Sequence, residues 1–221
     1  MTETSRPLTV MIVDDHTLLV DSLSTVLSMQ GVSAVRPELS SPAAVHEQAQ
    51  ATSPDLVLLD LDLGGAIGAG EDLIEQLCAD GHRVLVVSGS RDAGRLGSCL
   101  AGGAHGVLSK SLPVAALVGH VLTAARGEPV MAESQRLQLI AAHRSSMSRE
   151  RDRKALFNLL SEREKAVLAA LAEGHSVGRI AASAVVSEAT VRTQVRSILA
   201  KLGVNSQLEA VAIAGRHGWF R

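Results

Sequence analysis

The sequence predicts a doubly wound α/β domain with a parallel sheet, followed by a smaller all-α domain. In the first half of the chain, short runs rich in Val and Leu alternate with helical patterns, as expected for strands buried on both faces. In the second half, apolar residues recur at helical spacing behind serines that can cap helices. The length of 221 residues exceeds one usual domain, and 46% hydrophobic residues are ample for two cores.

Four apolar runs define the expected strands. They are residues 8–13, 55–60, 83–88 and 106–110, each bounded by Gly, Pro or charged residues. In an open parallel α/β sheet, ligands bind in the crevice beyond the carboxyl ends of the strands. The polar residues at these ends should therefore converge, and they are Asp14, Asp15, Asp60, Ser88 and Lys110.

These residue types together indicate a phosphoryl-accepting site. Three carboxylates at close range repel one another and raise each other's pKa unless a cation lies among them. Oxygen-rich clusters of this kind suit Mg2+, which also binds substrate phosphate. A lysine and a hydroxyl then complete a clamp for the phosphoryl oxygens.

Each of these residues also has a simpler interpretation. Asp14 or Asp15 could cap the following helix, Ser88 could begin a turn, and Lys110 could be a solvated loop lysine. Asp60 is harder to explain in this way, because a carboxylate that ends a very apolar run is costly to bury unpaired. The order of the residues along alternating strands favours the site.

The charge is distributed unevenly along the chain. Residues 1–127 hold 7 Lys and Arg against 14 Asp and Glu, whereas residues 128–221 hold 14 against 9. An acidic half joined to a basic half indicates that only the second half meets a polyanion. Between them, apolar residues at helical spacing precede a mixed-charge run at 149–154, which predicts a short helix and then a solvated tether. One continuous helix is the alternative.

The basic half predicts a series of capped helices. Ser161 and Glu164 form a capping box, a second helix runs from about Val177 to Ala184, and Ser187 caps a third. In this third helix the apolar stripe is Val191, Val195, Ile198 and Leu202. The opposite face carries Ala189, Thr193, Arg196 and Ala200, with Arg192 on its shoulder. Small residues and arginines are what a helix in a DNA major groove needs, although a solvated basic face would also fit the arginines alone.

The composition excludes several classes of function. Aromatic residues make up only 1% with no Tyr, which disfavours stacking platforms for single-stranded nucleic acid. Cys78 and Cys99 offer no spaced pairs, so buried thiols in a reducing cytosol are expected and zinc is not. Without a run of about 18 apolar residues or a signal sequence, we expect a soluble, cytoplasmic protein with no membrane contact.

Both halves resemble known families. VDDH (13–16), LLDLDLGG (58–65), VVSG (86–89) and AGGAHGVLSK (101–110) resemble the receiver domain of two-component response regulators. LSERE, EGHSVGRIA and VSEATVRTQVRSILAKLGV, within 160–219, resemble the LuxR-type helix-turn-helix domain. Together the halves are similar to the NarL/FixJ class of response regulators.

The resemblance implies an organisation and a set of site residues. It implies a flavodoxin-like receiver with a five-stranded parallel sheet at 1–127, a helical, charged linker at 128–157 and a four-helix helix-turn-helix domain at 158–221. Asp60 would accept a phosphoryl group from a partner histidine kinase, and Ser88 and Lys110 would bind its oxygens. Asp14, Asp15, Asp60 and the main-chain carbonyl of Asp62 would hold Mg2+.

The resemblance also implies the contacts to DNA. Arg192, Thr193 and Arg196 would face bases or nearby phosphates of double-stranded DNA. Arg179, Thr190 and Lys201 would touch the DNA backbone, and residues 207–216 would form the dimerisation helix. A homodimer is therefore expected, and RNA polymerase stays open as a further partner.

Several positions depart from the family pattern. Leu63-Gly64 stands where receivers usually have Met-Pro, and the loop at 64–70 is glycine-rich. Val107 replaces the aromatic switch residue, and Ser111 rather than Pro follows Lys110. Because glycine increases conformational freedom, a mobile loop or inefficient phosphorylation is expected.

The sequence thus favours a phosphorylation-responsive, dimeric transcription regulator that is not an enzyme, apart from assisting its own phosphotransfer and dephosphorylation. One alternative is a phosphorylation-independent regulator controlled by a ligand or a protein. A remote alternative is a phosphatase of the DxD type, because Asp60 and Asp62 have that spacing.

Overall fold

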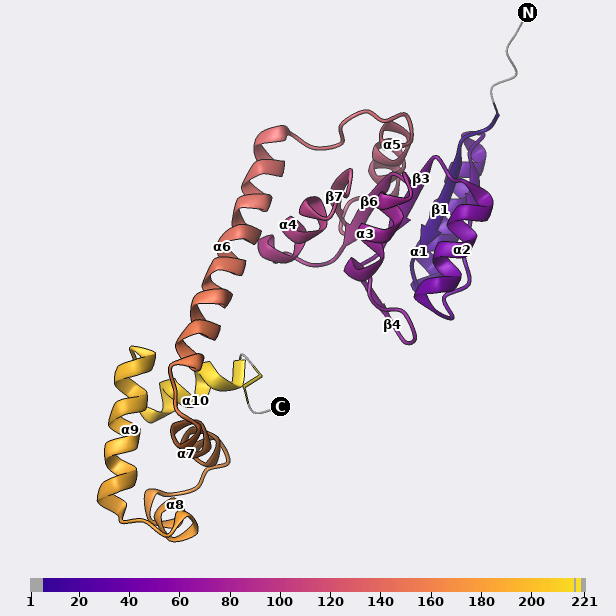
Figure 1. The fold of residues 1–221 in the computed structure, drawn as a ribbon. Coiled ribbons are helices and arrows are strands. Elements are labelled where there is room, and N and C mark those ends of the chain that lie inside the picture. Colours follow the sequence, from indigo (N-terminus) through magenta and orange to yellow (C-terminus); the bar gives the residue numbers. More distant parts are fainter. Residues whose placement is uncertain (1–5, 217, 220–221) are drawn as a thin grey trace, which may run out of the picture. The chain divides into compact units, whose positions relative to one another are not determined.

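A computed structural model describes residues 6–216, 218 and 219, and it divides the chain into two compact units, Met1–Ser146 and Met147–Arg221. The first unit alternates strands and helices (Figure 1). Its elements are β1 (Thr9–Val13), α1 (Thr17–Met29), β2 (Ser33–Val35), α2 (Pro42–Thr52), β3 (Leu56–Leu59), β4 (Asp62–Gly64), β5 (Gly68–Ala69), α3 (Glu71–Ala79), β6 (Val84–Ser88), α4 (Ala93–Ala101), β7 (Gly106–Ser109) and α5 (Val114–Ala125).

The first unit contains the predicted five-stranded parallel sheet, with strand order β2-β1-β3-β6-β7. The chain moves outward from β1 in one direction and then in the other, so the order reverses between β1 and β3. Such a reversal leaves a crevice beyond the carboxyl ends of the two strands, which is where ligands bind in folds of this kind. The doubly wound architecture predicted from the sequence is confirmed.

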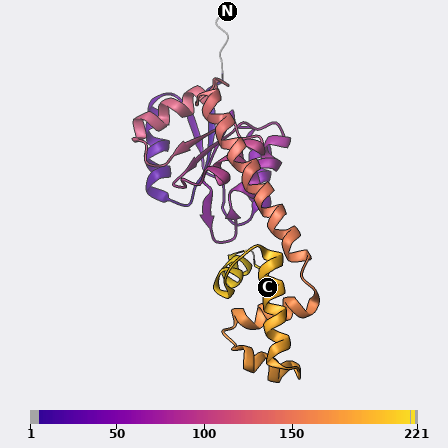
Figure 2. The ribbon, with the colours of Figure 1, turned by 90° about the vertical axis from the view of Figure 1, so that its left-hand side faces the viewer.

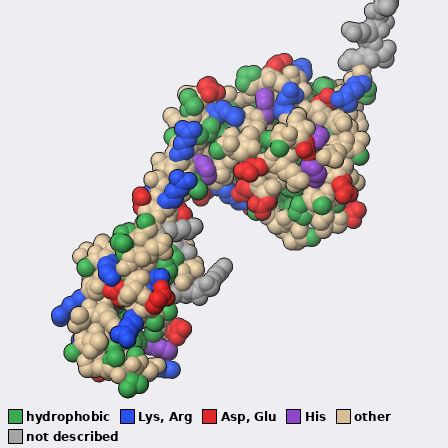
Figure 3. All heavy atoms as spheres, in the orientation of Figure 1, with side chains coloured by type: hydrophobic (Ala, Val, Ile, Leu, Met, Phe, Trp, Pro, Cys, Tyr) green, Lys and Arg blue, Asp and Glu red, His purple; other side chains and the backbone are tan. Residues whose placement is uncertain are grey.

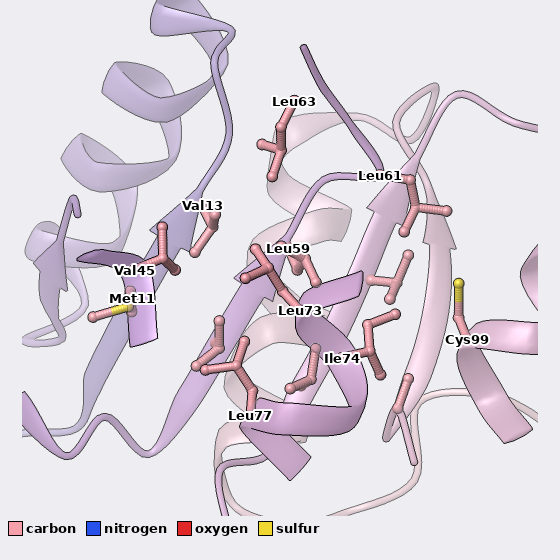
Figure 4. Close-up of a cluster of buried hydrophobic side chains, with 14 of the residues drawn as sticks. Met11, Val13, Val45, Leu59, Leu61, Leu63, Leu73, Ile74, Leu77 and Cys99 are labelled. Carbon is pink, nitrogen blue, oxygen red and sulfur yellow. The ribbon is translucent and has the colours of Figure 1, made fainter. Parts of the chain in front are cut away.

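Alternate residues of each strand enter two separate cores. Met11 and Val13 of β1 pack in the core on the side of α2, α3 and α4, whereas Val10 and Ile12 pack in the core beneath α1 and α5. Figure 4 shows the first of these cores, where Leu73, Ile74 and Leu77 of α3 lie against the sheet. Burial of both faces explains why the strands are continuously apolar.

The glycine-rich segment after β3 forms a short antiparallel hairpin of β4 and β5. Gly64, Gly65 and Gly68 have positive φ angles of 58°, 52° and 76°, which residues with a Cβ rarely adopt. The expected loop therefore contains a defined turn, and it returns the chain to α3 close to Asp60.

The linker prediction of a short helix and then a tether is wrong, because α6 (Glu133–Asn158) is one continuous helix of 26 residues. The segment contains neither Gly nor Pro, and its Arg, Glu, Lys and Ala residues all favour helix. The run of mixed charges has no apolar residues at helical spacing, which is why the sequence predicted a tether there. The run also contains no residue that would end a helix.

The second unit contains α7 (Glu162–Ala172), α8 (Val177–Ala184), α9 (Glu188–Leu202) and α10 (Gln207–Arg216). Ser161, Ser176 and Ser187 cap the first three of these helices, and Ser161 forms the predicted capping box with Glu164. The predicted apolar stripe of α9 is buried in the core of this unit. The second unit is therefore an all-α domain with a helix-turn-helix formed by α8 and α9, which Figure 2 shows from a second direction.

Two further features of the described residues concern the cysteines and the length of apolar helices. Cys99 is buried and Cys78 is half-buried, both are free, and burial raises the pKa of the Cys99 thiol to about 11. No helix in the described part of the chain combines the length and the apolar character that crossing a bilayer requires.

Candidate phosphoryl-acceptor and nucleic-acid sites

The carboxyl ends of β1 and β3 bring three carboxylates together, as the sequence predicted. Asp14 and Asp15 follow β1, and Asp60 follows β3. Oxygen atoms of these three side chains and a ring nitrogen of His16 all lie within 4.8 Å of one another. Asp14 and Asp60 are buried, at 5% and 2% exposed, whereas Asp15 lies at the surface.

Lys110, after β7, forms ion pairs with the two buried carboxylates. Its Nζ lies 2.8 Å from Asp14 Oδ2 and 2.7 Å from Asp60 Oδ2. Burial opposes the charged form of Lys110, but the hydrogen bonds to both carboxylates outweigh it and raise the pKa of Lys110. The ammonium is therefore charged at neutral pH and lies directly beside the candidate phosphoryl acceptor.

Asp60 is fixed by its backbone surroundings. The Leu61 amide donates to Asp60 Oδ1 at 2.7 Å, and the Asp60 amide donates to Val13 O at 2.9 Å. A Cβ at Gly70 would lie only 2.1 Å from the Asp60 carbonyl oxygen. The start of α3 can approach the acceptor this closely only because Gly70 has no side chain.

His16 is a member of the site that the sequence prediction missed. Its Nδ1 lies 2.8 Å from Asp15 Oδ1, 3.0 Å from Asp14 Oδ1 and 3.3 Å from Lys110 Nζ. Its position directly after two aspartates at a strand end was the signal that could have identified it.

Ser88 ends β6 at the same edge of the sheet and is 1% exposed. The Lys110 amide donates to Ser88 O at 2.9 Å, and the Ser90 amide donates to Ser88 Oγ at 3.0 Å. Ser90 Oγ in turn accepts from the Asp92 amide at 3.2 Å, and Asp92 caps α4. A line of hydrogen bonds therefore joins Ser88 to the start of α4.

The carboxylate of Asp62 is held by Arg95 of α4. Arg95 Nη1 donates to Asp62 Oδ1 at 2.7 Å, while its Nε and Nη2 contact the Glu71 carboxylate. The Glu71 hydrogen bond is the largest of the effects that raise the pKa of Arg95. No local pattern in the sequence indicated this contact, because it depends on the packing of α3 against α4.

The donor set fits a hard divalent cation such as Mg2+. Three carboxylates converge at one point, and a buried carboxylate pair needs positive charge nearby. Lys110 supplies one positive charge at Asp14 and Asp60, so a divalent ion would complete the neutralisation of the cluster.

The second candidate site is the exposed face of α9. Arg192, Thr193 and Arg196 are exposed there, as the helical spacing predicted. Thr190 on the same helix and Arg179 on α8 are exposed as well. Arg192 Nη2 lies 3.1 Å from Glu188 Oε2, one turn earlier on the same helix. Figure 3 shows Lys and Arg side chains on the surface of this unit.

Lys201 differs from the other residues predicted to meet DNA. It is half-buried, and its Nζ lies 2.7 Å from Oε2 of Glu164, a carboxylate that is 6% exposed. Burial alone would raise the pKa of Glu164, but hydrogen bonds from Lys201, Ser197 and Ser161 hold this pKa at about 2. The Lys201 ammonium is therefore already paired inside the unit.

Comparison with known proteins identifies both units. Residues 10–122 match the family model of the response regulator receiver domain, and residues 158–214 match that of the bacterial regulatory proteins of the luxR family. The chain is 31% identical over 211 residues to the nitrate/nitrite response regulator protein NarP of Escherichia coli, covering 95% of each chain. It is 34% identical over 208 residues to the probable transcriptional regulatory protein NarL of Mycobacterium tuberculosis, covering 94% of this chain and 93% of the relative.

Solved structures share the fold. The RcsB response regulator of Salmonella typhimurium aligns with a TM-score of 0.52 at 20% identity, over 96% of this chain and 99% of that one. A LuxR-family response regulator from Aurantimonas aligns with a TM-score of 0.51 at 25% identity, over 63% of this chain and 99% of that one.

Proposed function

Because the chain belongs to the NarL/FixJ class of two-component response regulators, we propose that phosphorylation of Asp60 controls its binding to DNA. Its receiver and its LuxR-type domain make it a DNA-binding transcription regulator. The observation that best supports control at Asp60 is the position of Lys110, whose Nζ lies 2.7 Å from the Asp60 carboxylate.

Phosphotransfer requires a nucleophile, charge neutralisation and oxygen-binding groups. A carboxylate oxygen of Asp60 attacks phosphorus, an acyl-phosphate bond forms, and the bond from phosphorus to the histidine nitrogen of the kinase breaks. Lys110 and Ser88 bind the oxygens of the transferred group. The charged Lys110 ammonium lies 2.7 Å from the Asp60 carboxylate, which supports a role in which its positive charge stabilises the transition state without rearrangement.

Mg2+ supplies the remaining positive charge when it is bound. We propose that Asp14, Asp15, Asp60 and the main-chain carbonyl of Asp62 hold it. The convergence of the three carboxylates supports this assignment. With such an ion held there, Asp60 would repel an incoming phosphoryl group less.

We propose that α9 enters the DNA major groove. Arg192, Thr193 and Arg196 then face bases or nearby phosphates, and Arg179 and Thr190 contact the DNA backbone. Their exposure on one side of the helix-turn-helix supports this assignment. A phosphate contact by Lys201 is also proposed, but its ammonium would have to be shared with Glu164.

A homodimer would place two recognition helices on a near-palindromic site. The exposed Leu208 on α10, at 80%, supports the use of this helix as a dimer surface. The partners that we propose are double-stranded DNA, a histidine kinase, a second copy of the chain and RNA polymerase. We propose a cytoplasmic location, because double-stranded DNA and the phosphate-donating part of a histidine kinase would both have to be accessible to this chain.

We propose no enzymatic activity beyond assistance to phosphotransfer and dephosphorylation at Asp60. A phosphatase of the DxD type needs the second aspartate as an acid and base. The carboxylate of Asp62 is instead paired with Arg95, which disfavours that alternative.

The test is incubation of the full chain with acetyl phosphate and Mg2+, followed by intact mass measurement. We expect one added phosphoryl group on the wild type and none on Asp60→Asn. A second arm measures binding to a selected DNA site by fluorescence anisotropy before and after phosphorylation. An unmodified wild type that still binds DNA would support the phosphorylation-independent alternative.

A further inference from the structure

The cationic side chain of Arg95 joins α4, on which it lies, to two other segments of the receiver, namely the residues after Asp60 and the start of α3. Its Nη2 donates to the Leu61 carbonyl oxygen at 3.1 Å, and its Nη1 donates to the Asp62 carboxylate at 2.7 Å. Its Nε and Nη2 also hold the Glu71 carboxylate at the start of α3. The side chain is 29% exposed, so these contacts are partly shielded from solvent.

The contacts of Arg95 lie directly after the acceptor. Leu61 and Asp62 follow Asp60, and the carbonyl of Asp62 is a proposed ligand of the cation. A planar guanidinium that donates in a fixed fork fixes the geometry of its acceptors more strictly than a flexible ammonium does. A change in the loop on phosphorylation would therefore move the guanidinium, and Arg95 would transmit the movement to α4.

The other side of α4 carries the first half of α6 (Figure 1). A Cβ at Gly97 would lie 2.0 Å from the Leu139 carbonyl oxygen and 2.9 Å from His143 Cβ. The two helix backbones can approach so closely only at a glycine. We call this contact, formed by Gly97 of α4 with Leu139 and His143 of α6, the α6 seat.

Other contacts keep the start of α6 on the receiver. Arg136 donates to the carbonyl oxygens of His105 and Ala104, at 3.0 and 3.1 Å, just before β7. Leu139 and Ile140 pack against the core beneath α3 and α4. The half-buried residues Arg136, Leu139, Ile140 and His143 form one stripe at helical spacing.

The receiver lacks the aromatic ring that could otherwise report on Ser88. Val107 is aliphatic and 8% exposed within the core, so it cannot alternate between buried and exposed positions as an amphipathic ring can. Among the described residues, two sets of hydrogen bonds link this edge of the sheet to α4, namely the line from Ser88 to Asp92 and the Arg95 contacts.

We infer that Arg95 is a positioning residue that couples the loop after Asp60 to α4 and thereby to the α6 seat. The inference rests on the proposed function, because the signal is phosphorylation at Asp60. It assigns the output of the receiver to the helix that continues into the second unit.

The test is methyl NMR of the full chain labelled at isoleucine δ1 positions. The chain has seven isoleucines. Ile67 lies in the turn between β4 and β5 and reports on the loop, whereas Ile140 lies in α6 and reports on the seat. Addition of Mg2+ and beryllofluoride, a mimic of the phosphoryl group, should shift both signals in the wild type.

Variants separate the coupling from the binding. In Arg95→Gln we expect the Ile67 shift to persist and the Ile140 shift to fall at least twofold. Arg95→Lys keeps the charge but not the forked geometry, so its Ile140 shift should lie between those of Arg95→Gln and the wild type. Asp62→Asn weakens the same contact from the loop side and should also reduce the Ile140 shift. Arg91→Gln is the matched control, because it removes an exposed arginine four residues earlier and should behave like the wild type.

Gly97→Ala displaces α6 without touching Arg95. The Ile140 methyl signal should then have a new chemical shift that no longer responds to beryllofluoride, while the Ile67 signal still responds.

The outcomes distinguish the inference from the proposed function. Lack of an Ile67 response in the wild type would overturn the proposed function and the inference with it. An Ile67 response without an Ile140 response in the wild type, or equal Ile140 responses in Arg95→Gln and the wild type, would overturn the inference alone. A purely structural role of Arg95 would change both signals together.

Discussion

Glu164 joins the beginning of α7 to the end of α9. Its Oε1 accepts from Ser197 at 2.7 Å, and its Oε2 accepts from Lys201 at 2.7 Å and from the Ser161 amide at 2.7 Å. One carboxylate therefore caps a helix and fixes the helix that we propose to read DNA.

This carboxylate should make the second unit sensitive to acid. The pKa of Glu164 is about 2 in the folded state and near 4.5 when unperturbed, so its stabilisation is complete above about pH 4.5 and is lost as the pH falls toward 2. Glu164→Gln should be less stable than the wild type at about pH 6, and the difference should shrink by about pH 3. The measurement is urea unfolding followed by the methyl signals of Ile180 and Ile198. For Glu162→Gln, at an exposed neighbouring position, the difference in stability from the wild type should not shrink in this way between the two pH values.

Val185 should be a site of backbone strain. It has φ 53° and ψ 46° at the end of α8, a conformation that is unfavourable for a β-branched residue, and its side chain is 91% exposed. Val185→Asn should therefore raise the free energy of unfolding of the second unit by about 1 kcal/mol, because Asn tolerates this conformation and no burial is lost. Val185→Ala should recover less, since alanine removes the β-branch but has no polar side chain to hydrogen-bond locally in this conformation. A lower stability of the Asn variant in urea unfolding would contradict the argument.

At the scale of the elements, the start of α3 lies unusually close to the acceptor strand. Gly70→Ala would place a Cβ 2.1 Å from the Asp60 carbonyl oxygen and 2.9 Å from Leu61 Cα, both of them backbone atoms. We expect a loss of about 1–3 kcal/mol in receiver stability and slower phosphorylation, because the loop after Asp60 must move. Gly89→Ala, with open space around its Cβ, is the control and should have little effect. Intact mass measured over time with acetyl phosphate checks the rate.

The elements that the sequence predicted best are those with a local pattern. The runs that end at Asp60 and Ser88 are strands because burial on both faces makes every residue apolar, and strand ends then place the polar residues together. Arg95 was missed because its partners come from other elements. The prediction for α6 failed because the mixed charges on its exposed face hid the apolar periodicity. The segment nevertheless contains no residue that would end a helix.

Lys201 illustrates the same limit in the DNA-binding unit. Its place on α9 was predicted, but Glu164, its partner 37 positions earlier, could be recognised only from the folded structure. Spacing along one helix identifies a face, whereas the partner of a charged side chain depends on tertiary packing.

At the scale of the whole molecule, charge should set DNA affinity. We expect affinity to fall steeply with salt, because phosphates neutralised by the protein release counterions. Arg196→Ala should cost about 1–3 kcal/mol of binding free energy and relax the preference at one base position. The measurement is fluorescence anisotropy of the full chain on a selected site across a salt series. Curves that match the wild type would remove Arg196 from the recognition surface.

Lys201→Ala should behave differently from Arg196→Ala. Because it leaves the buried Glu164 carboxylate without its ammonium, we expect it to lower the stability of the second unit by about 1–3 kcal/mol. If Lys201 also meets DNA, affinity for all sequences should fall alike and the salt slope should flatten by about one unit. Unchanged stability would show that the pair with Glu164 contributes little.

The scarcity of aromatic residues has an optical consequence. Trp219 is the chain's single tryptophan, there is no tyrosine, and the Trp219 ring lies against Phe157 with centroids 4.2 Å apart, both within the second unit. Selective excitation of tryptophan therefore reaches this one indole, and its emission depends on how the ring is packed. An emission spectrum of the intact protein should consequently report on the DNA-binding unit alone, and the receiver should unfold without a fluorescence signal of its own.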